Sequence, residues 1–274
     1  MSSGKIRETW YNINQLINKK IDNKLHPIII NNEKLFDSKL IAQAFNDYFV
    51  NLFNKPSDIN PVYKNYISFN NPQSFSLEPT DPYEIIKFAN LLSNSRSSDS
   101  HCLSNWILKI IIHPLSDILA YLVNKVFFSA IFPDCLKIAR IVPIHKNDSL
   151  NELSNYRPIS LISCLSKLIE KIFKSKIELY LKNHNILNKN QYGFRKGFST
   201  EDAVLHFVNE VVRNSDNGNH TLALFIDFSK AFDSVNHKLL ILKLECYGIR
   251  GKPSELISSY LSNRFQYVSI NGIL

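Results

Sequence analysis

Residues 220–236 read His-Thr-Leu-Ala-Leu-Phe-Ile-Asp-Phe-Ser-Lys-Ala-Phe-Asp-Ser-Val-Asn. The six residues from Thr221 to Ile226 are nearly all apolar, which predicts a short core strand that ends at Asp227. A buried strand would hold this carboxylate rigidly, and Mg²⁺ takes one or two rigid carboxylates together with substrate phosphates. Taken alone, Asp227 is more simply an ordinary helix cap after a strand. The rest of the sequence has to distinguish these two interpretations.

Three upstream segments carry further candidate residues. Apolar and polar positions alternate between Lys137 and Lys146, which predicts a strand that ends in a cation. Residues 155–160 read Asn-Tyr-Arg-Pro-Ile-Ser, and the residue before a proline avoids the α region, so Arg157 is expected on a stiff extended segment. Residues 191–200 read Gln-Tyr-Gly-Phe-Arg-Lys-Gly-Phe-Ser-Thr.

Residues 225–233 resemble the first catalytic motif of reverse transcriptases from non-LTR, LINE-type retrotransposons, above all those of the jockey-like group. The three upstream segments resemble three further motifs of that family and follow in the family's order. Because four motifs match in order, a chance match is negligible. The resemblance covers roughly residues 80–274 and, more loosely, a helix expected over 41–49. Where the family often has a Gly-x-Asp-Gly turn, this chain has Asp99-Ser100-His101-Cys102.

The resemblance implies a role for each matching residue. Asp227 would hold Mg²⁺ through its side chain and Phe228 through its backbone carbonyl, while Phe232 would lie under the sugar and exclude a 2′-hydroxyl. Lys146 and Arg157 would hold the incoming triphosphate, since paired cations suit a developing phosphoryl charge. The residues expected near the template and the nascent base pair are Gln191, Gly193, Phe194 and Arg195. A glycine is physically reasonable there, because it allows a close approach to the backbone.

The resemblance also implies a fold and a function. The expected fold is an α+β right-hand polymerase with helix-rich fingers and an incomplete palm. Residues 1–78 would form an N-terminal helical region and linker, and residues 79–274 the fingers and partial palm. The implied activity is that of an RNA-directed DNA polymerase, with two Mg²⁺ ions as cofactors. Its partners would be an RNA template, a DNA primer and deoxynucleoside triphosphates.

The carboxylates needed for a second metal site are missing from this sequence. Nucleotidyl transfer uses two metal ions about 3.5–4 Å apart, and the family supplies further ligands from a downstream Tyr-x-Asp-Asp hairpin. The sequence has no Asp-Asp pair, and Asp233 would point about 120° away from Asp227 on a helix. Residues 266–270 predict a strand and Asn271-Gly272 a hairpin turn, with two residues left for the return. We therefore expect a fragment that exposes an apolar sheet edge and is inactive alone.

A non-enzymatic product is the alternative that the sequence leaves open. Such a protein would bind nucleic acid and derive from a domesticated or decayed element. The 32 Lys and Arg against 24 Asp and Glu give a net charge of +8, which favours polyanionic partners in either case.

The sequence gives less information on the cellular compartment. No apolar stretch reaches the roughly 18 residues of a membrane span, so no membrane partner is expected. The cysteines lack Cys-x-x-Cys spacing, which favours free thiols in an intracellular, reducing compartment. No cluster of five consecutive cations is present, so nucleus and cytoplasm both stay open.

Local patterns predict the remaining elements. We expect a helix over 5–21, a strand over 28–30, a helix from residue 38, a linker over 54–80 and a helix that starts at Asp81-Pro82. Between 103 and 128 the pattern predicts two helices separated at His113-Pro114. A further helix over 165–182 carries Lys167, Lys171 and Lys174 on its outer face, where they either contact phosphates or, more simply, face solvent.

Overall fold

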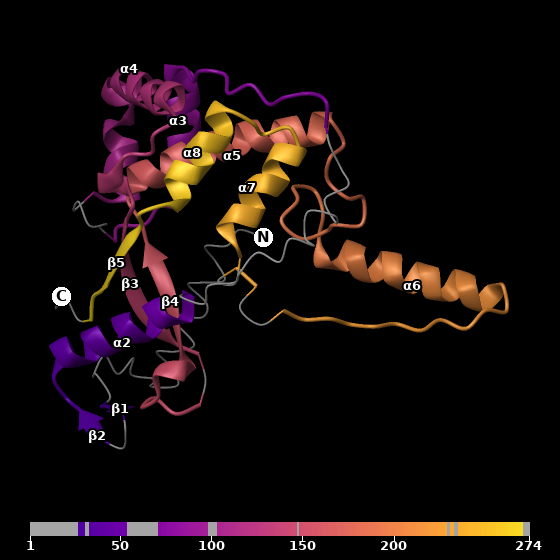
Figure 1. Cartoon of the computed structure of the whole chain (residues 1–274), viewed down its shortest axis with the longest axis horizontal. Coiled ribbons are helices and arrows are strands. Elements are labelled where there is room, and N and C mark those ends of the chain that lie inside the picture. The colour runs from indigo at the N-terminus through magenta and orange to yellow at the C-terminus, as the bar shows by residue number, and fades with distance from the viewer. Residues whose placement is uncertain are drawn as a thin grey trace.

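The computed structural model describes residues 27–30, 33–53, 71–97, 103–146, 148–228, 231–232 and 235–270. Its mixture of helices and strands confirms the predicted α+β class (Figure 1). The elements are β1 (Ile28–Ile30), β2 (Glu33–Leu35), α2 (Ser38–Phe53), α3 (Pro82–Asn90), α4 (Asn105–Ser129), η2 (Asp134–Leu136), β3 (Ile138–His145), η3 (Leu153–Asn155), β4 (Tyr156–Leu161), α5 (Cys164–Asn183), α6 (Thr200–Asp216), α7 (His237–Cys246), α8 (Lys252–Leu261) and β5 (Phe265–Val268).

The larger sheet has the strand order β4-β3-β5. The central strand β3 is antiparallel to β4, with Arg140 opposite Leu161, and parallel to β5, with Ile138 opposite Phe265. All three strands were predicted from the local sequence, β3 by its alternation and β4 by its proline, and their positions agree within about two residues. A separate antiparallel pair joins β1 to β2, with Ile28 opposite Leu35.

Helix α2 lies across the sheet (Figure 1). Its residues Ile41, Phe45 and Phe49 are buried in one cluster with Ile141 of β3 and Val268 of β5. The apolar face predicted for this helix is therefore the face that packs. The proposed domain boundary near residue 78 remains a prediction.

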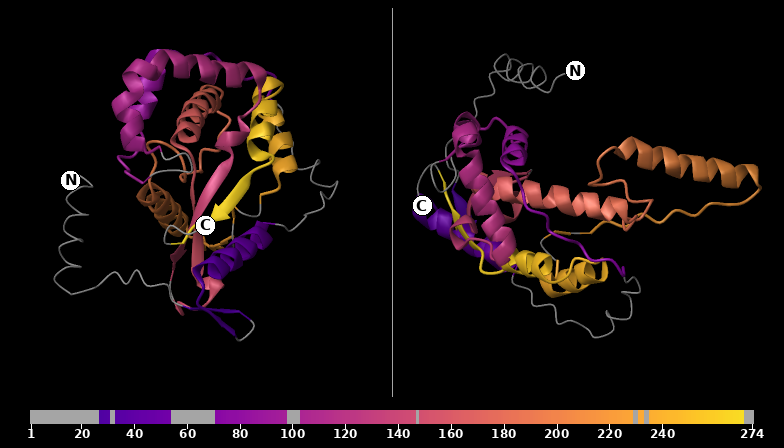
Figure 2. Two further views of the ribbon diagram at one scale, coloured as in Figure 1. Left: turned by 90° about the vertical axis from the view of Figure 1, so that its left-hand side faces the viewer. Right: turned by 90° about the horizontal axis from the view of Figure 1, so that it is seen from above.

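A layer of helices forms the second core. In Figure 2, α4 arches over α5 while α8 lies to one side. Helix α3 starts as predicted, because the Asp81 side chain accepts the backbone N–H of Glu84 at 2.7 Å. The buried residues shared by α3, α4, α5 and α8 include Ile85, Leu108, Ile112, Leu168, Ile172 and Leu256.

The prediction of two helices between 103 and 128 is wrong. Helix α4 runs unbroken from Asn105 to Ser129 with Pro114 inside it. An internal proline costs about 3 kcal/mol, but the burial of Leu108, Ile112 and Val123 along one face offsets that cost. By length and composition alone, α4 is long and apolar enough to cross a membrane, as core helices of soluble proteins also can be. In this fold α4 packs against α3, α5 and α8.

The core strand predicted over Thr221–Ile226 is also wrong. Residues 221–228 form no strand, and the side chains of Leu222 and Phe225 are 97% and 82% exposed. The central strand β3 already pairs on both edges, and no described strand pairs with 221–226, so the backbone groups of this segment face water. The segment follows α6, which projects from the body and buries no residue (Figures 1 and 2).

Some predictions lie outside the described residues. They concern the helix over 5–21, the loop Asp99–Cys102, the side chain of Asp233 and the turn Asn271-Gly272.

Candidate functional site

Lys146 and Arg157 lie at the tip of the ribbon formed by β3 and β4. Arg157 is opposite Ile144, and the backbone N–H of Lys146 extends the ladder by donating to the Asn155 carbonyl at 2.8 Å. Residues two apart on a strand share a face, as do residues directly opposite each other. Lys146 and Arg157 are therefore diagonal neighbours on one face, and such neighbours lie about 7–8 Å apart. Both side chains are exposed, so both can contact the same polyphosphate.

Tyr156 anchors this ribbon to α2. Its ring stands edge-on to Phe45 at a centroid distance of 4.9 Å and to His145 at 5.3 Å. Its hydroxyl donates to the Leu150 carbonyl at 2.8 Å, and burial raises the pKa of this phenol. Aromatic packing thus holds this end of the ribbon against α2, while the two cations beside His145 and Tyr156 face solvent.

Asp227 is not presented by a buried strand. Its side chain is exposed, and Phe228 beside it is 76% exposed. No hydrogen bond or ion pair joins Asp227 to Lys146 or Arg157 in the described part of the chain. The structure therefore brings the two cations together but does not bring the carboxylate into contact with them.

The loop before α6 contains the residues expected near the template. Phe194 has a φ of 61° and its side chain is 86% exposed. Its ring stands edge-on to Phe232, with centroids 5.6 Å apart and an interplanar angle of 86°. The fold thus joins a residue of the expected template group to a residue of the expected nucleotide group.

Arg195 and Gln191 stabilise this same loop. Nη1 of Arg195 donates to the carbonyls of Asn188 and Gln191 at 2.9 and 3.3 Å. The guanidinium also lies 4.4 Å from the ring centroid of Phe198. A Cβ at Gly193 would meet no atom within 4 Å, so close packing within the described chain gives no reason for a glycine there.

The described residues do not fit a two-metal centre. They contain no group of three or more His, Cys, Asp or Glu side chains that could hold a metal ion. Mg²⁺ requires near-octahedral oxygen ligands, and a single exposed carboxylate at Asp227 supplies too few of them. We therefore derive no catalytic step through a metal from this geometry.

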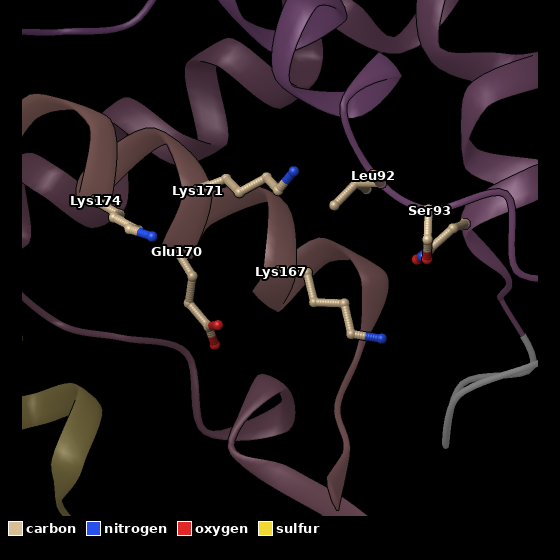
Figure 3. A pocket seen from close by; sticks show the side chains of 7 residues that line it. Leu92, Ser93, Lys167, Glu170, Lys171 and Lys174 are labelled. Carbon is tan, nitrogen blue, oxygen red and sulfur yellow. The ribbon is translucent and has the colours of Figure 1, made fainter. Parts of the chain in front are cut away.

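A basic groove lies between α5 and the start of α4 (Figure 3). It has a volume of about 330 Å³. The sequence pointed to the lysines of α5 but missed the polar residues that face them, Ser93 and Asn105. The groove is lined by Leu92, Ser93, Asn105, Lys167, Glu170, Lys171 and Lys174.

Comparisons with known proteins agree with the motif pattern. Residues 144–273 match the family model described as reverse transcriptase (RNA-dependent DNA polymerase). The chain is 32% identical over 200 residues to the probable RNA-directed DNA polymerase from transposon BS of Drosophila melanogaster. The aligned region covers 70% of this chain and 21% of the relative. It is 28% identical over 174 residues to the RNA-directed DNA polymerase from mobile element jockey of the same species, covering 62% and 19%.

The chain therefore spans about a fifth of the length of the curated relatives it matches. The matched region holds Lys146, Arg157, Phe194 and Asp227. Residues 144–273 thus carry the sequence pattern of the reverse transcriptase (RNA-dependent DNA polymerase) family, and both relatives are named as RNA-directed DNA polymerases, one from a transposon and one from a mobile element.

Proposed function

We propose that this chain is part of an RNA-directed DNA polymerase of a non-LTR retrotransposon. The observation that carries the proposal is the shared face of Lys146 and Arg157 at the tip of the β3–β4 ribbon, inside the region that matches the family. The non-enzymatic alternative is not favoured, because the relatives named above are described as polymerases.

The two cations would bind the triphosphate of the incoming nucleotide. Hydrogen bonds to charged groups contribute about 1.5–3 kcal/mol each, and the Arg157 guanidinium can contact phosphate oxygens bidentately. The stiff backbone before Pro158 limits the loss of entropy when this arginine is fixed. Phe232, with Phe194 against it, would contact the sugar, and the loop with Gln191, Gly193 and Arg195 would lie near the template.

Reverse transcriptases generally use divalent metal ions, and we propose Asp227 as one ligand, with the backbone carbonyl of Phe228 beside it. The further ligands would come from outside the described residues. Loss of about 4 kcal/mol of transition-state stabilisation lowers a rate about a thousandfold. The chain alone would therefore show negligible synthesis.

The right-hand arrangement belongs to the same proposal. The helical layer of α3, α4 and α5 together with the β3–β4 ribbon would form fingers, and residues 221–270 would contribute to a palm. The free thiol of Cys246 is compatible with a reducing intracellular compartment, nucleus or cytoplasm.

Primer extension tests the proposal. The protein encoded by the longest reading frame that contains residues 1–274 is incubated with an RNA template, a DNA primer, nucleotides and Mg²⁺. We expect extension on RNA, and Lys146→Ala or Arg157→Ala should each raise the KM for nucleotides about tenfold or more, since each removes a charged hydrogen bond. Lys189→Ala, an exposed lysine in the matched region, is the control. Absence of synthesis, or an unchanged KM in both variants, would contradict it.

A further inference from the structure

The lysines of the basic groove are not a freely solvated helix face. Lys167 and Lys171 are half-buried, and only Lys174 is exposed. The ammonium of Lys171 donates to the Leu91 carbonyl at 2.6 Å, which holds it at the groove edge. Figure 3 shows Lys171 and Lys167 extending from α5 toward Leu92 and Ser93, while Lys174 lies beside Glu170.

The charge of the groove is only partly balanced within the described chain, where Lys174 forms an ion pair with Glu178 at 3.4 Å. Neither Lys167 nor Lys171 has an ion-pair partner within 4 Å among the described residues. Glu170 carries the one carboxylate of the lining. This carboxylate already accepts hydrogen bonds from the hydroxyls of Ser166 at 2.9 Å and Tyr260 at 3.1 Å. Like charges at i and i+4 destabilise a helix by about 0.2–0.5 kcal/mol, so this spacing favours a bound anion.

The opposite wall of the groove supplies polar groups. Asn105 is the first residue of α4, whose N-terminus carries the positive end of the helix dipole. The side-chain amide of Asn105 donates to the Ser93 hydroxyl at 3.1 Å. Asn105 and Lys167 also border a smaller depression lined by Ser95 and Ser97, so the polar surface continues beyond the main groove.

The length of the lysine row matches a repeating anion. Seven residues of helix separate Lys167 from Lys174, which is about 10 Å at 1.5 Å per residue. Each of the three lysines can contact one phosphate of a strand that runs along the row, whereas a single small anion would engage only part of it.

We propose that Lys167, Lys171 and Lys174, with Ser93 and Asn105 opposite them, bind the phosphodiester backbone of an RNA strand. The lining of this groove includes neither Lys146 nor Arg157 of the ribbon. This proposal rests on the proposed function, because RNA is chosen among the polyanions on the ground that the chain is part of an RNA-directed polymerase. Because backbone contacts carry no base information, binding here is independent of sequence.

Salt-dependent RNA binding tests the groove. Affinity of the full chain for a labelled single-stranded RNA is measured across salt concentrations for wild type and for Lys167→Gln/Lys171→Gln/Lys174→Gln. The control is Lys34→Gln/Lys39→Gln/Lys125→Gln, which removes the same charge from exposed positions outside the groove. Each phosphate contact contributes about 0.7 to the slope of log affinity against log salt, so the groove variant should lose about 2 units and bind at least tenfold more weakly than the control.

A variant with arginine at the same three positions keeps the charge and controls for misfolding. The variant Lys167→Arg/Lys171→Arg/Lys174→Arg should restore most of the affinity and slope. Equal binding by the groove and control variants, weak binding by the arginine variant, or loss of binding to anionic lipid vesicles with unchanged RNA binding would each overturn the proposal.

The experiments distinguish a failure of the proposed function from a failure of the groove proposal. In that case the lysine-dependent RNA binding stands while the longer protein extends no primer. If only the groove proposal fails, primer extension stands and RNA binding does not depend on these lysines.

Discussion

The ring of Phe194 stands edge-on to the ring of Phe232, with centroids 5.6 Å apart and planes at 86°. The two residues lie on opposite sides of α6 in the sequence, one before it and one after the segment that contains Asp227. Their side chains are 86% and 75% exposed, so the pair presents apolar ring surface to solvent. This contact links the loop before α6 to the segment 225–233, which resembles a catalytic motif.

A double-mutant cycle measures this contact. Edge-to-face pairs contribute about 0.5–1.5 kcal/mol beyond area burial, and because both rings are exposed we expect a coupling of about 0.5 kcal/mol between Phe194→Ala and Phe232→Ala. The free energy of unfolding in urea gives the coupling. Phe194→Ala combined with Phe228→Ala is the control, since Phe228 is equally exposed. Additive effects in the first pair would show that the contact does not form.

Gly248→Ala should destabilise the fold strongly. Gly248 has a φ of +96°, and an added Cβ would overlap with the Tyr180 hydroxyl and the Gln73 carbonyl. That hydroxyl accepts from the Asn71 side chain at 2.9 Å and donates to Gln73 at 2.8 Å, so the overlap disrupts a buried network. We expect a loss of at least about 2 kcal/mol in urea unfolding. Gly193→Ala, with open space around it, should change stability by less than about 0.5 kcal/mol.

Pro114→Ala should stabilise the chain. The substitution restores a backbone donor inside α4 and removes the clash of the ring with the preceding turn. The variant also gains freedom in the unfolded state, which offsets part of the benefit, so we expect a net gain of about 1–2 kcal/mol. Thermal and urea unfolding measure it. Pro253→Ala in the first turn of α8, where proline fits, should give no gain, and a gain there as large as at Pro114 would refute the explanation.

Tyr260 should make stability fall at alkaline pH. Burial, followed by the nearby Glu170 carboxylate, raises the pKa of this phenol to about 12. Because the folded pKa lies above the unfolded value of about 10, the contribution is complete below about pH 10 and is lost as the pH rises through about 12.

Urea unfolding at about pH 8 and pH 11 checks this dependence. Wild type should lose more stability between the two values than Tyr260→Phe, which cannot titrate there. The remaining loss in the variant reflects other groups such as Tyr156 and Tyr180, whose pKa values burial also raises. Equal losses in the two proteins would contradict the assignment.

Local patterns predicted β1, α2, α3, β3, β4, α5 and β5, whereas β2 and the helices α6, α7 and α8 were not predicted. The alternation around β3, the proline-stiffened β4 and the Asp81 cap of α3 each depend on neighbours in the sequence, and each was confirmed. The failures have non-local causes. Packing along the whole of α4 overrides Pro114, and an apolar run such as 221–226 cannot show whether a partner strand is present.

The arrangement of the candidate site was predicted only in part. The resemblance implied that Lys146 and Arg157 act together, and the strand register places them on one face. The contact between Phe194 and Phe232 could not be predicted, because α6 lies between them in the sequence. The expectation of a rigid, buried position for Asp227 was wrong, since that position depends on strand pairing.

The most direct measurement compares Asp227→Asn with Asp216→Asn in primer extension by the longer protein on an RNA template with Mg²⁺. Asp216 is an exposed acid at the end of α6, so its substitution makes the same chemical change outside the motif. If Asp227 is a metal-ligating carboxylate, Asp227→Asn should lower the rate about a thousandfold or more, while Asp216→Asn stays within about twofold of wild type. Synthesis by Asp227→Asn at a rate close to that of Asp216→Asn would contradict the assignment of Asp227 to catalysis.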